Sequence, residues 1–249
     1  MSRNDPSVIE REREFHNARF AHDETREHQG KYYFAIRDCD DEYERLLAEH
    51  GRGAVVLDYG CARGEYALNL APIATEVHGI DISDVAIETA RAEAKARGLT
   101  NAHFDVMDAH ATSFPDDHFD FVFGIGIIHH LETRRAFAEI ARILKPGGVA
   151  IFREPLSGNL LIDLYRKATP AARTVDEHPL TVADHRIAAE YFPRNDWRFY
   201  GLATLGAVPF RNTPAGAPIF KVAAAIDRAL FTIPPVRWQA WNALMKLGK

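Results

Sequence analysis

Residues 55–65 read VVLDYGCARGE and contain the turn that decides the fold. An apolar run ends at Asp58, and a helix is predicted to begin near Gly64. Gly60 and Gly64 allow backbone conformations that other residues avoid, and they carry no side chain where a ligand must approach closely. We therefore expect a buried strand, a glycine turn and a helix, with backbone N–H groups of the turn facing a crevice beyond the strand.

Two kinds of ligand compete for this turn. The dinucleotide fingerprint G-x-G-x-x-G is not satisfied, because the glycine positions hold Gly60, Ala62 and Gly64. Asp58, just before them, would repel a pyrophosphate but suits a cationic ligand, directly or through a water. A strand-to-helix turn with no ligand stays open as the alternative.

Short apolar runs continue along the chain and alternate with helical patterns. The runs occupy residues 54–60, 75–82, 102–109, 119–127 and 147–155. Strands that alternate with helices of ordinary length indicate βαβ units and a parallel sheet. Burial on both faces explains apolar runs without a period of two.

The segments outside these runs give weaker patterns. Residues 10–19 and 42–48 are predicted to be helical, and a strand is predicted over 197–204. Residues 236–247 are ambiguous: the spacing of Trp238, Trp241 and Leu244 favours a helix. A final strand is our preferred interpretation of that segment.

Carboxylates follow successive predicted strands. Asp81 comes after an apolar run, about twenty residues beyond Gly60, where nucleoside-binding α/β folds place the acceptor for ribose hydroxyls. The alternative role is a helix N-cap, but Ser83 or Asp84 is better placed for that. Asp108 follows the third strand and could accept a hydrogen bond from the exocyclic amine of adenine, with Met107 packed on the ring.

This series resembles the class I S-adenosylmethionine-dependent methyltransferase family, in the group whose first motif reads VLDxGCGxG. Residues 114–120, FPDDHFD, are similar to that group's LPFPDxSFDxV stretch, and residues 144–148 match its LKPGG turn. The resemblance covers roughly residues 54–155. Ala62 departs from the pattern, because the family usually has glycine there.

The resemblance implies an α/β fold: a doubly wound, mostly parallel seven-stranded sheet with helices on both faces. It implies a helical N-terminal cap over residues 1–50, a cofactor-binding core over 51–156, and completion of the sheet with acceptor-binding elements over 157–249. The implied cofactor is S-adenosyl-L-methionine, which leaves as S-adenosyl-L-homocysteine. The implied cofactor contacts are Asp58, Gly60, Cys61, Ala62, Gly64, Asp81, Ile82, Met107, Asp108, Ala109 and Gly124.

A histidine pair follows the fourth strand, where the sulfonium should lie. His129 or His130 could accept the proton of an acceptor hydroxyl, since imidazole titrates near neutrality. Either histidine could instead orient the neighbouring helix. We expect no metal site from the pair, because adjacent helical residues diverge by about 100° and no carboxylate partner is evident.

Candidate acceptor contacts come from outside the core. Tyr32 and Tyr33 could cover the cofactor, although packing is an equal alternative. Glu154 could bind a cationic or hydroxylated acceptor, or pair with Arg153 or another base. The C-terminal part is expected to build the acceptor side through Asn159, Arg173, Asp176, Glu177, His178 and Pro179.

Composition narrows the class of protein. The 249 residues carry a formal charge of −5 and no basic stripe, so a nucleic-acid partner is not expected. Two cysteines, a polar N-terminus and the lack of a run of roughly 18 apolar residues favour a cytoplasmic protein without stable membrane insertion.

Residues 219–241 are apolar and suit core packing, with a homodimer contact or a lipid-like acceptor surface as alternatives.

The leading hypothesis is methyl transfer to a small-molecule acceptor such as a natural product, sugar, lipid or quinone precursor. Oxygen is the favoured acceptor atom, and nitrogen and carbon stay open. A non-catalytic cofactor-binding subunit that activates a partner is the second hypothesis. A nicotinamide oxidoreductase is the third, and the incomplete glycine pattern argues against it.

Overall fold

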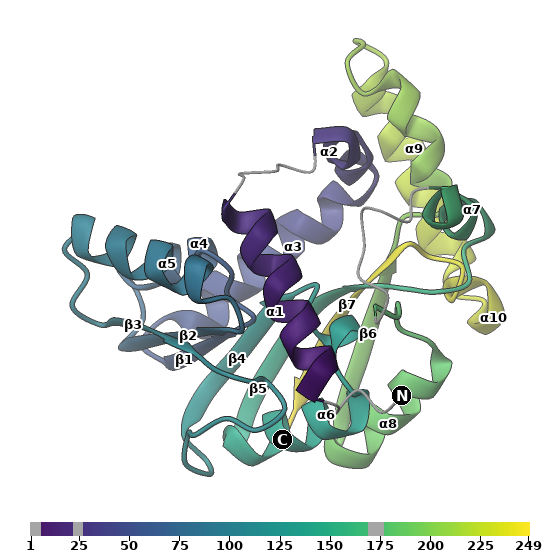
Figure 1. Cartoon of the computed structure of the whole chain (residues 1–249). Coiled ribbons are helices and arrows are strands. Elements are labelled where there is room, and N and C mark those ends of the chain that lie inside the picture. The colour runs from purple at the N-terminus through teal and green to yellow at the C-terminus, as the bar shows by residue number, and fades with distance from the viewer. Residues whose placement is uncertain (1–5, 22–26, 169–176) are drawn as a thin grey trace.

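Seven strands form one sheet in the computed structural model, in the order β3-β2-β1-β4-β5-β7-β6 (Figure 1). The structure describes residues 6–21, 27–168 and 177–249. Strands β1 to β5 pair in parallel, whereas β7 runs antiparallel to both β5 and β6. The strands are β1 Val55–Tyr59, β2 Glu76–Asp81, β3 Ala102–Val106, β4 Phe119–Ile125, β5 Leu144–Pro155, β6 Arg194–Tyr200 and β7 Asn242–Gly248.

Helices cover both faces of this sheet, so the predicted doubly wound α/β fold is confirmed. The α-helices are α1 Pro6–Ala21, α2 Glu27–Tyr33, α3 Arg37–Gly51, α4 Glu65–Leu70, α5 Asp84–Ala96, α6 Thr133–Ile143, α7 Leu160–Ala168, α8 Val182–Tyr191, α9 Gly216–Leu230 and α10 Pro234–Arg237. Short 3-10 helices are η1 Phe34–Ile36, η2 Ile128–His130 and η4 Ala203–Phe210.

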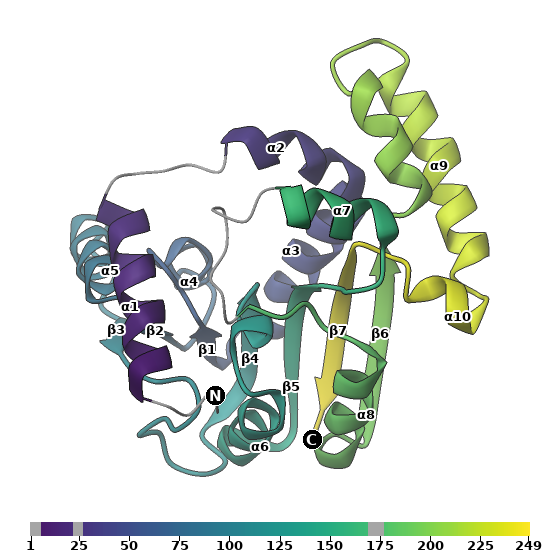
Figure 2. The same cartoon turned by 45° about the vertical axis from the view of Figure 1, so that its right-hand side comes forward.

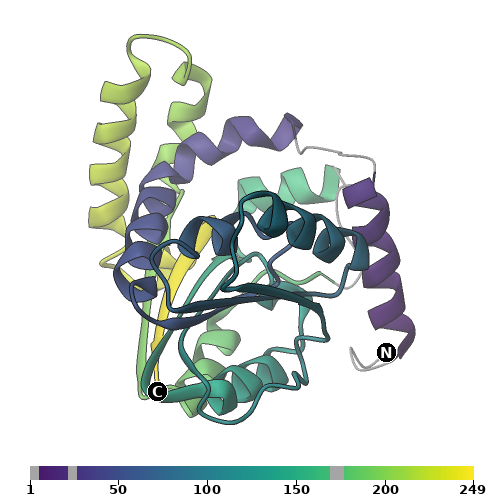
Figure 3. The same cartoon turned by 90° about the vertical axis from the view of Figure 1, so that its left-hand side faces the viewer.

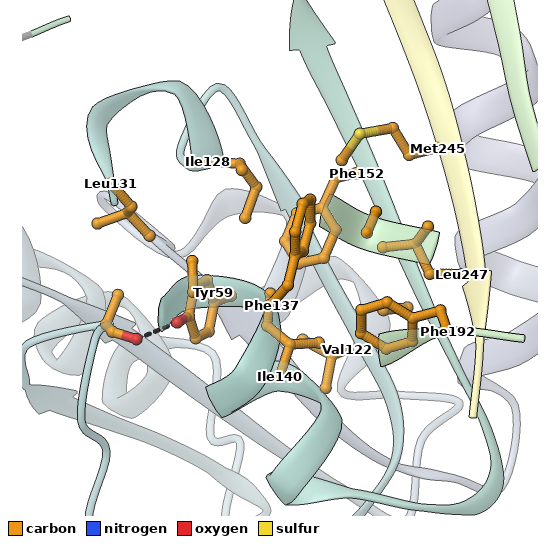
Figure 4. Close-up of a cluster of buried hydrophobic side chains, with 14 of the residues drawn as sticks. Tyr59, Val122, Ile128, Leu131, Phe137, Ile140, Phe152, Phe192, Met245 and Leu247 are labelled. Atoms are coloured by element: carbon orange, nitrogen blue, oxygen red, sulfur yellow. Dashed lines mark hydrogen bonds between the residues drawn. The ribbon is translucent and has the colours of Figure 1, made fainter. Parts of the chain in front are cut away.

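Two buried clusters hold the layers together, one on each face of the sheet. On one face Phe137 and Ile140 of α6 pack with Phe152 of β5 (Figure 4). On the other, Tyr43 of α3 and Ile87 of α5 belong to a second cluster. Neighbouring strand residues contribute to opposite clusters, as the alternation of side chains along a strand requires.

The C-terminal part differs from expectation in its boundaries. The strand predicted over 197–204 runs instead over Arg194–Tyr200, and the 3-10 helix η4 follows it. In the ambiguous segment, α10 ends at Arg237 and β7 begins at Asn242. The preferred strand is therefore confirmed, because pairing with β5 and β6 on both sides outweighs the local helical spacing.

Several N-terminal and C-terminal helices gather at the end of the sheet where the parallel strands finish. In Figure 2, α2 and α7 lie above the upper end of β5. Figure 3 shows α1, in purple, beside α5, whereas α9 projects on the far side of the molecule. No helix in the described ranges is both long and apolar enough to cross a membrane. Arg173 and Asp176, expected on the acceptor side, lie outside the described residues.

Candidate functional site

A cavity of about 600 Å³ lies at the carboxyl ends of the parallel strands β1 to β5. Its size is typical of pockets for small molecules. Most residues expected at the cofactor, the histidine pair and the two tyrosines line it. The predicted residues on its wall are Tyr32, Tyr33, Gly60, Ala62, Asp81, Ile82, Met107, Asp108, Ala109, His129 and His130.

Asp81 joins the glycine turn to the start of α5. Its Oδ2 accepts a hydrogen bond from Ala62 N at 2.9 Å, and its Oδ1 accepts one from Ser83 N at 2.9 Å. Ser83, and not Asp81, caps α5 by accepting from Ala86 N, which confirms the expectation for that cap. Each oxygen of Asp81 keeps further acceptor capacity, because a carboxylate offers about four lone-pair sites.

Glycine is required where the turn meets the loop after β4. Gly60 has φ +82°, and a Cβ there would stand 2.7 Å from Ile127 Cγ1. Gly60 N and Cys61 N both donate to Ile80 O, which pins the turn to the end of β2. The turn therefore presents bare backbone to the cavity. Ala62 adopts φ +48°, a conformation that costs a residue with a side chain.

Asp108 is held by its own neighbour. Its Oδ1 accepts from His110 N at 2.8 Å and lies 2.9 Å from His110 Nδ1. His110 Nε2 accepts from Glu132 N, so the proton of this ring is on Nδ1. The hydrogen bond from His110 lowers the pKa of Asp108. Asp108 therefore faces the cavity as a carboxylate, an acceptor, at neutral pH.

Five of the residues expected in the site stand behind the cavity wall. They are Asp58, Cys61, Gly64, Gly124 and Glu154. Burial raises the pKa of Asp58 to about 8, opposed by a hydrogen bond from the Ala67 backbone. A Cβ on Gly124 would lie 2.6 Å from Tyr59 O, so Gly124 serves the approach of β4 to β1. Direct contact of the first four with the cofactor, and of Glu154 with the acceptor, stays a prediction that the cavity lining does not support.

His129 is fixed by a buried carboxylate at the end of β5. Its Nδ1 lies 2.7 Å from Glu154 Oε2, while Glu154 Oε1 accepts from Ile127 N at 2.8 Å and Ile128 N at 2.9 Å. Glu154 is 0% exposed, so it would reach an acceptor only through His129. Burial alone would lower the pKa of His129, but the hydrogen bond with Glu154 and the nearby carboxylate of Glu177 outweigh burial and raise it.

His130 has a different carboxylate beside it, from α1. Its Nδ1 lies 3.3 Å from Glu12 Oε2 of α1, and burial lowers its pKa. Glu177 Oε1, in turn, lies 3.6 Å from His129 Nε2. The premise that the pair has no carboxylate partner is therefore wrong. Local sequence could not reveal these partners, because α1 and residue 177 reach the pair only through the tertiary fold.

Some residues of the cavity wall were not predicted from the sequence, or were predicted only in part. Glu177 was expected on the acceptor side and does line the cavity, whereas Glu12 and Arg166 were not assigned to it. The four-residue spacing of Glu12 and His16 on a helix places them on one face, and this was the signal available. Arg153 of the cavity wall pairs with Asp40 of α3.

Comparison with known proteins places these features in a family. Residues 56–148 match the model of the family described as a methyltransferase domain. Aklanonic acid methyltransferase DauC of a Streptomyces species is 41% identical over 117 residues, which are 44% of this chain and 52% of that protein. The O-methyltransferase cnsE of Penicillium expansum is 33% identical over 150 residues, 57% of this chain and 54% of that protein.

Solved structures share the fold at low identity. The [4+2]-cyclase SpnF has 22% identity and a TM-score of 0.57, with coverage of 84% of this chain and 80% of that one. A putative methyltransferase from Bacillus halodurans has 18% identity and a TM-score of 0.58, with coverage of 85% and 99%. The chain spans about half the length of the curated relatives named above. The matched residues are nevertheless those that carry the glycine turn, Asp81 and Asp108, so the chain contains a class I S-adenosylmethionine-dependent methyltransferase domain.

Proposed function

We propose that this protein transfers the methyl group of S-adenosylmethionine to an oxygen atom of a small molecule bound in the cavity. The observation that carries the proposal is the convergence of the glycine turn, Asp81, Asp108 and His129 on one cavity of about 600 Å³. Two curated relatives, over about half their length, are named as methyltransferases, and one of these is named an O-methyltransferase.

The residues present fit the cofactor. Asp81 has acceptor capacity left for ribose hydroxyls after binding Ala62 N and Ser83 N. Asp108 would accept from the adenine amine, and Met107 would pack against the ring. Gly60 leaves room for the methionine end against the bare turn. When bound, the sulfonium supplies an electrophilic methyl carbon.

His129 is the residue placed to handle the acceptor. Glu154 fixes its ring through Nδ1, so Nε2 is presented to the cavity beside Glu177. A hydroxyl that enters between Nε2 and Glu177 would donate to His129 and pass its proton there; a carboxylate acceptor would need no base. The enzyme otherwise contributes alignment and exclusion of water.

A second candidate is a protein that binds the cofactor without transferring its methyl group and acts on a partner. Exposed apolar residues on α9 favour it: Val222 is 63% exposed and Ile226, one helical turn later, is 47% exposed. Such a protein would bind S-adenosylmethionine and give no methylated product.

Calorimetric titration with S-adenosylmethionine, followed by an acceptor screen by mass spectrometry, tests the proposal. We expect binding and, with an accepted substrate, a mass gain of one methyl group that nuclear magnetic resonance places on oxygen. A His129→Asn variant should keep cofactor affinity and lose turnover of a hydroxyl substrate, whereas His103→Asn, on a half-exposed surface ring outside the cavity, should keep both. No binding at millimolar cofactor would refute the proposal, and a methyl on nitrogen or carbon would refute its choice of atom.

A further inference from the structure

Three cavity-lining side chains from two distant segments meet beside the histidine pair. Glu12 and His16 lie one turn apart on α1, and His130 comes from η2. Glu12 Oε2 lies 3.5 Å from His16 Nε2 and 3.3 Å from His130 Nδ1. The three potential ligand atoms all lie within 4.8 Å of one another. One carboxylate thus stands between two imidazole nitrogens.

These separations are long for hydrogen bonds and suited to a shared ion. Nitrogen-to-oxygen hydrogen bonds usually span 2.7–3.2 Å. Around a tetrahedral zinc ion with bonds of about 2.0–2.1 Å, neighbouring ligand atoms are about 3.3–3.5 Å apart. His130 Nδ1 is buried and makes no well-formed hydrogen bond with the part of the chain that the structure describes. Glu12 is only 8% exposed, so its carboxylate is held within the cavity wall.

We propose that Glu12, His16 and His130 bind one divalent transition-metal ion, with zinc as the best fit. Two imidazoles and one carboxylate are a ligand set that zinc takes in sites that keep a fourth position open. All three residues line the cavity, so the fourth position faces it. A water or an oxygen of the acceptor would occupy that position.

Such an ion would fasten α1 over the cavity. Helix α1 is already tied to the domain in its C-terminal part, where Asn17 Nδ2 donates to Asp84 at 2.5 Å and Arg63 donates to Phe20 O at 2.6 Å. The metal would add a bond from the middle of α1 to η2, the segment that carries both histidines. Binding of the ion at this site would not require methyl transfer.

A neighbouring group competes for the same ion. His129, His130 and Glu177 also place three ligand atoms within 4.8 Å. We favour the first group because Glu12 Oε2 lies 3.3 Å from His130 Nδ1 and 3.5 Å from His16 Nε2. In the second group Glu177 Oε1 lies 3.6 Å from His129 Nε2. His129 Nδ1 is also engaged by Glu154. The two groups share His130, so variants of the carboxylates separate them.

Titration of chelator-treated protein with Co²⁺, read by visible absorption, and with Zn²⁺, read by calorimetry, tests the site. We expect one equivalent of each ion in the parent and the visible bands of tetrahedral cobalt. Glu12→Gln should weaken binding by more than about 100-fold, since replacing even outer-shell partners costs 10- to 100-fold. His16→Asn provides a second variant on the same helix.

Two matched carboxylate variants serve as controls. Glu177→Gln removes the carboxylate of the competing group, and Glu76→Gln removes a half-exposed carboxylate that lies 3.2 Å from His78 and 3.3 Å from His103, outside the cavity. Binding that survives both changes and is lost in Glu12→Gln and His16→Asn supports the site. No stoichiometric binding by the parent, or binding lost in Glu177→Gln or Glu76→Gln but kept in Glu12→Gln, overturns it. Circular dichroism of the metal-free variants checks that each is folded; should Glu12→Gln not fold, His16→Asn decides by the same criteria.

Discussion

Replacing Asp81 by asparagine separates the two tasks of this residue, holding the glycine turn and binding the cofactor. The carboxylate accepts from Ser83 N through Oδ1 and from Ala62 N through Oδ2, each at 2.9 Å. An amide of the same size has one acceptor oxygen. One of the two backbone N–H groups must therefore face an NH₂ group, and the negative charge is lost.

The magnitudes follow from these contacts. A hydrogen bond to a charged group contributes about 1.5–3 kcal/mol. Losing one inside the protein should lower the free energy of unfolding by about 2 kcal/mol, or Tm by about 4–8 °C for a chain of this size. Removing the charged acceptor from the ribose should cost a similar binding free energy, which raises Kd for S-adenosylmethionine by about 10- to 150-fold.

Calorimetric titration with S-adenosylmethionine and urea unfolding measure the two effects on the same preparations. The matched control is Asp105→Asn, because Asp105 lies on the next strand, is half exposed, pairs with Arg91 and does not line the cavity. This control should keep cofactor affinity within about threefold. A Kd for Asp81→Asn that also stays within threefold of the parent would show that Asp81 does not bind the cofactor, whatever its effect on stability.

Three further substitutions test the backbone strain, the packing and the buried carboxylate beside the site. Ala62→Gly should raise Tm by about 2 °C in calorimetric scans. Relief of the left-handed backbone conformation contributes about 1–2 kcal/mol, which exceeds the entropic cost of glycine. A lower Tm would show that Ala62 is not strained. Phe152→Ala should cost about 3–5 kcal/mol in urea unfolding, because the ring is fully buried against Tyr59, and a loss below 1 kcal/mol would contradict that packing. Since burial raises the pKa of Asp58 to about 8, the native state binds the proton more tightly than the unfolded state, and stability should fall as pH rises from about 4 to 8. Asp58→Asn should lack this fall. Because a pKa shift corresponds to about 1.4 kcal/mol per unit, the free energies of unfolding of the parent and the variant should diverge by at most about 6 kcal/mol over this pH range. Parallel stability curves from pH 5 to 9 would refute the assignment.

Segments governed by local rules could be predicted from the sequence. The glycine turn after β1 and the serine cap of α5 depend on residues a few positions apart, and both are where the sequence places them. The carboxylates Asp81 and Asp108 meet on one cavity because carboxyl ends of parallel strands share an edge of the sheet. Their position in the crevice therefore followed from strand order alone.

Contacts across long stretches of chain could not be predicted in this way. Glu12 reaches His130 because α1 packs beside α5 and crosses the cavity, and nothing in the local sequence of α1 specifies that docking. The spacing of Trp238 and Trp241 favours a helix, yet the chain pairs as β7 from Asn242 onward because a strand there completes hydrogen bonds on two edges. In both cases a tertiary interaction outweighs a local preference.

The register between β4 and β5 explains the role of Glu154, which the sequence leaves ambiguous. The sequence places it at the mouth of the crevice and leaves acceptor binding and pairing with Arg153 or another base equally open. In the sheet Ile125 of β4 pairs with Arg153 of β5, so Glu154 stands beside the loop that leaves β4 and accepts from two of its N–H groups. The same carboxylate then fixes His129. Because one residue holds both the loop and the ring, Glu154→Gln should displace His129 and reduce turnover even though Glu154 lines no part of the cavity, while the Kd for S-adenosylmethionine, measured by calorimetry, should remain unchanged. A variant with normal turnover would show that the orientation of His129 does not matter to the reaction.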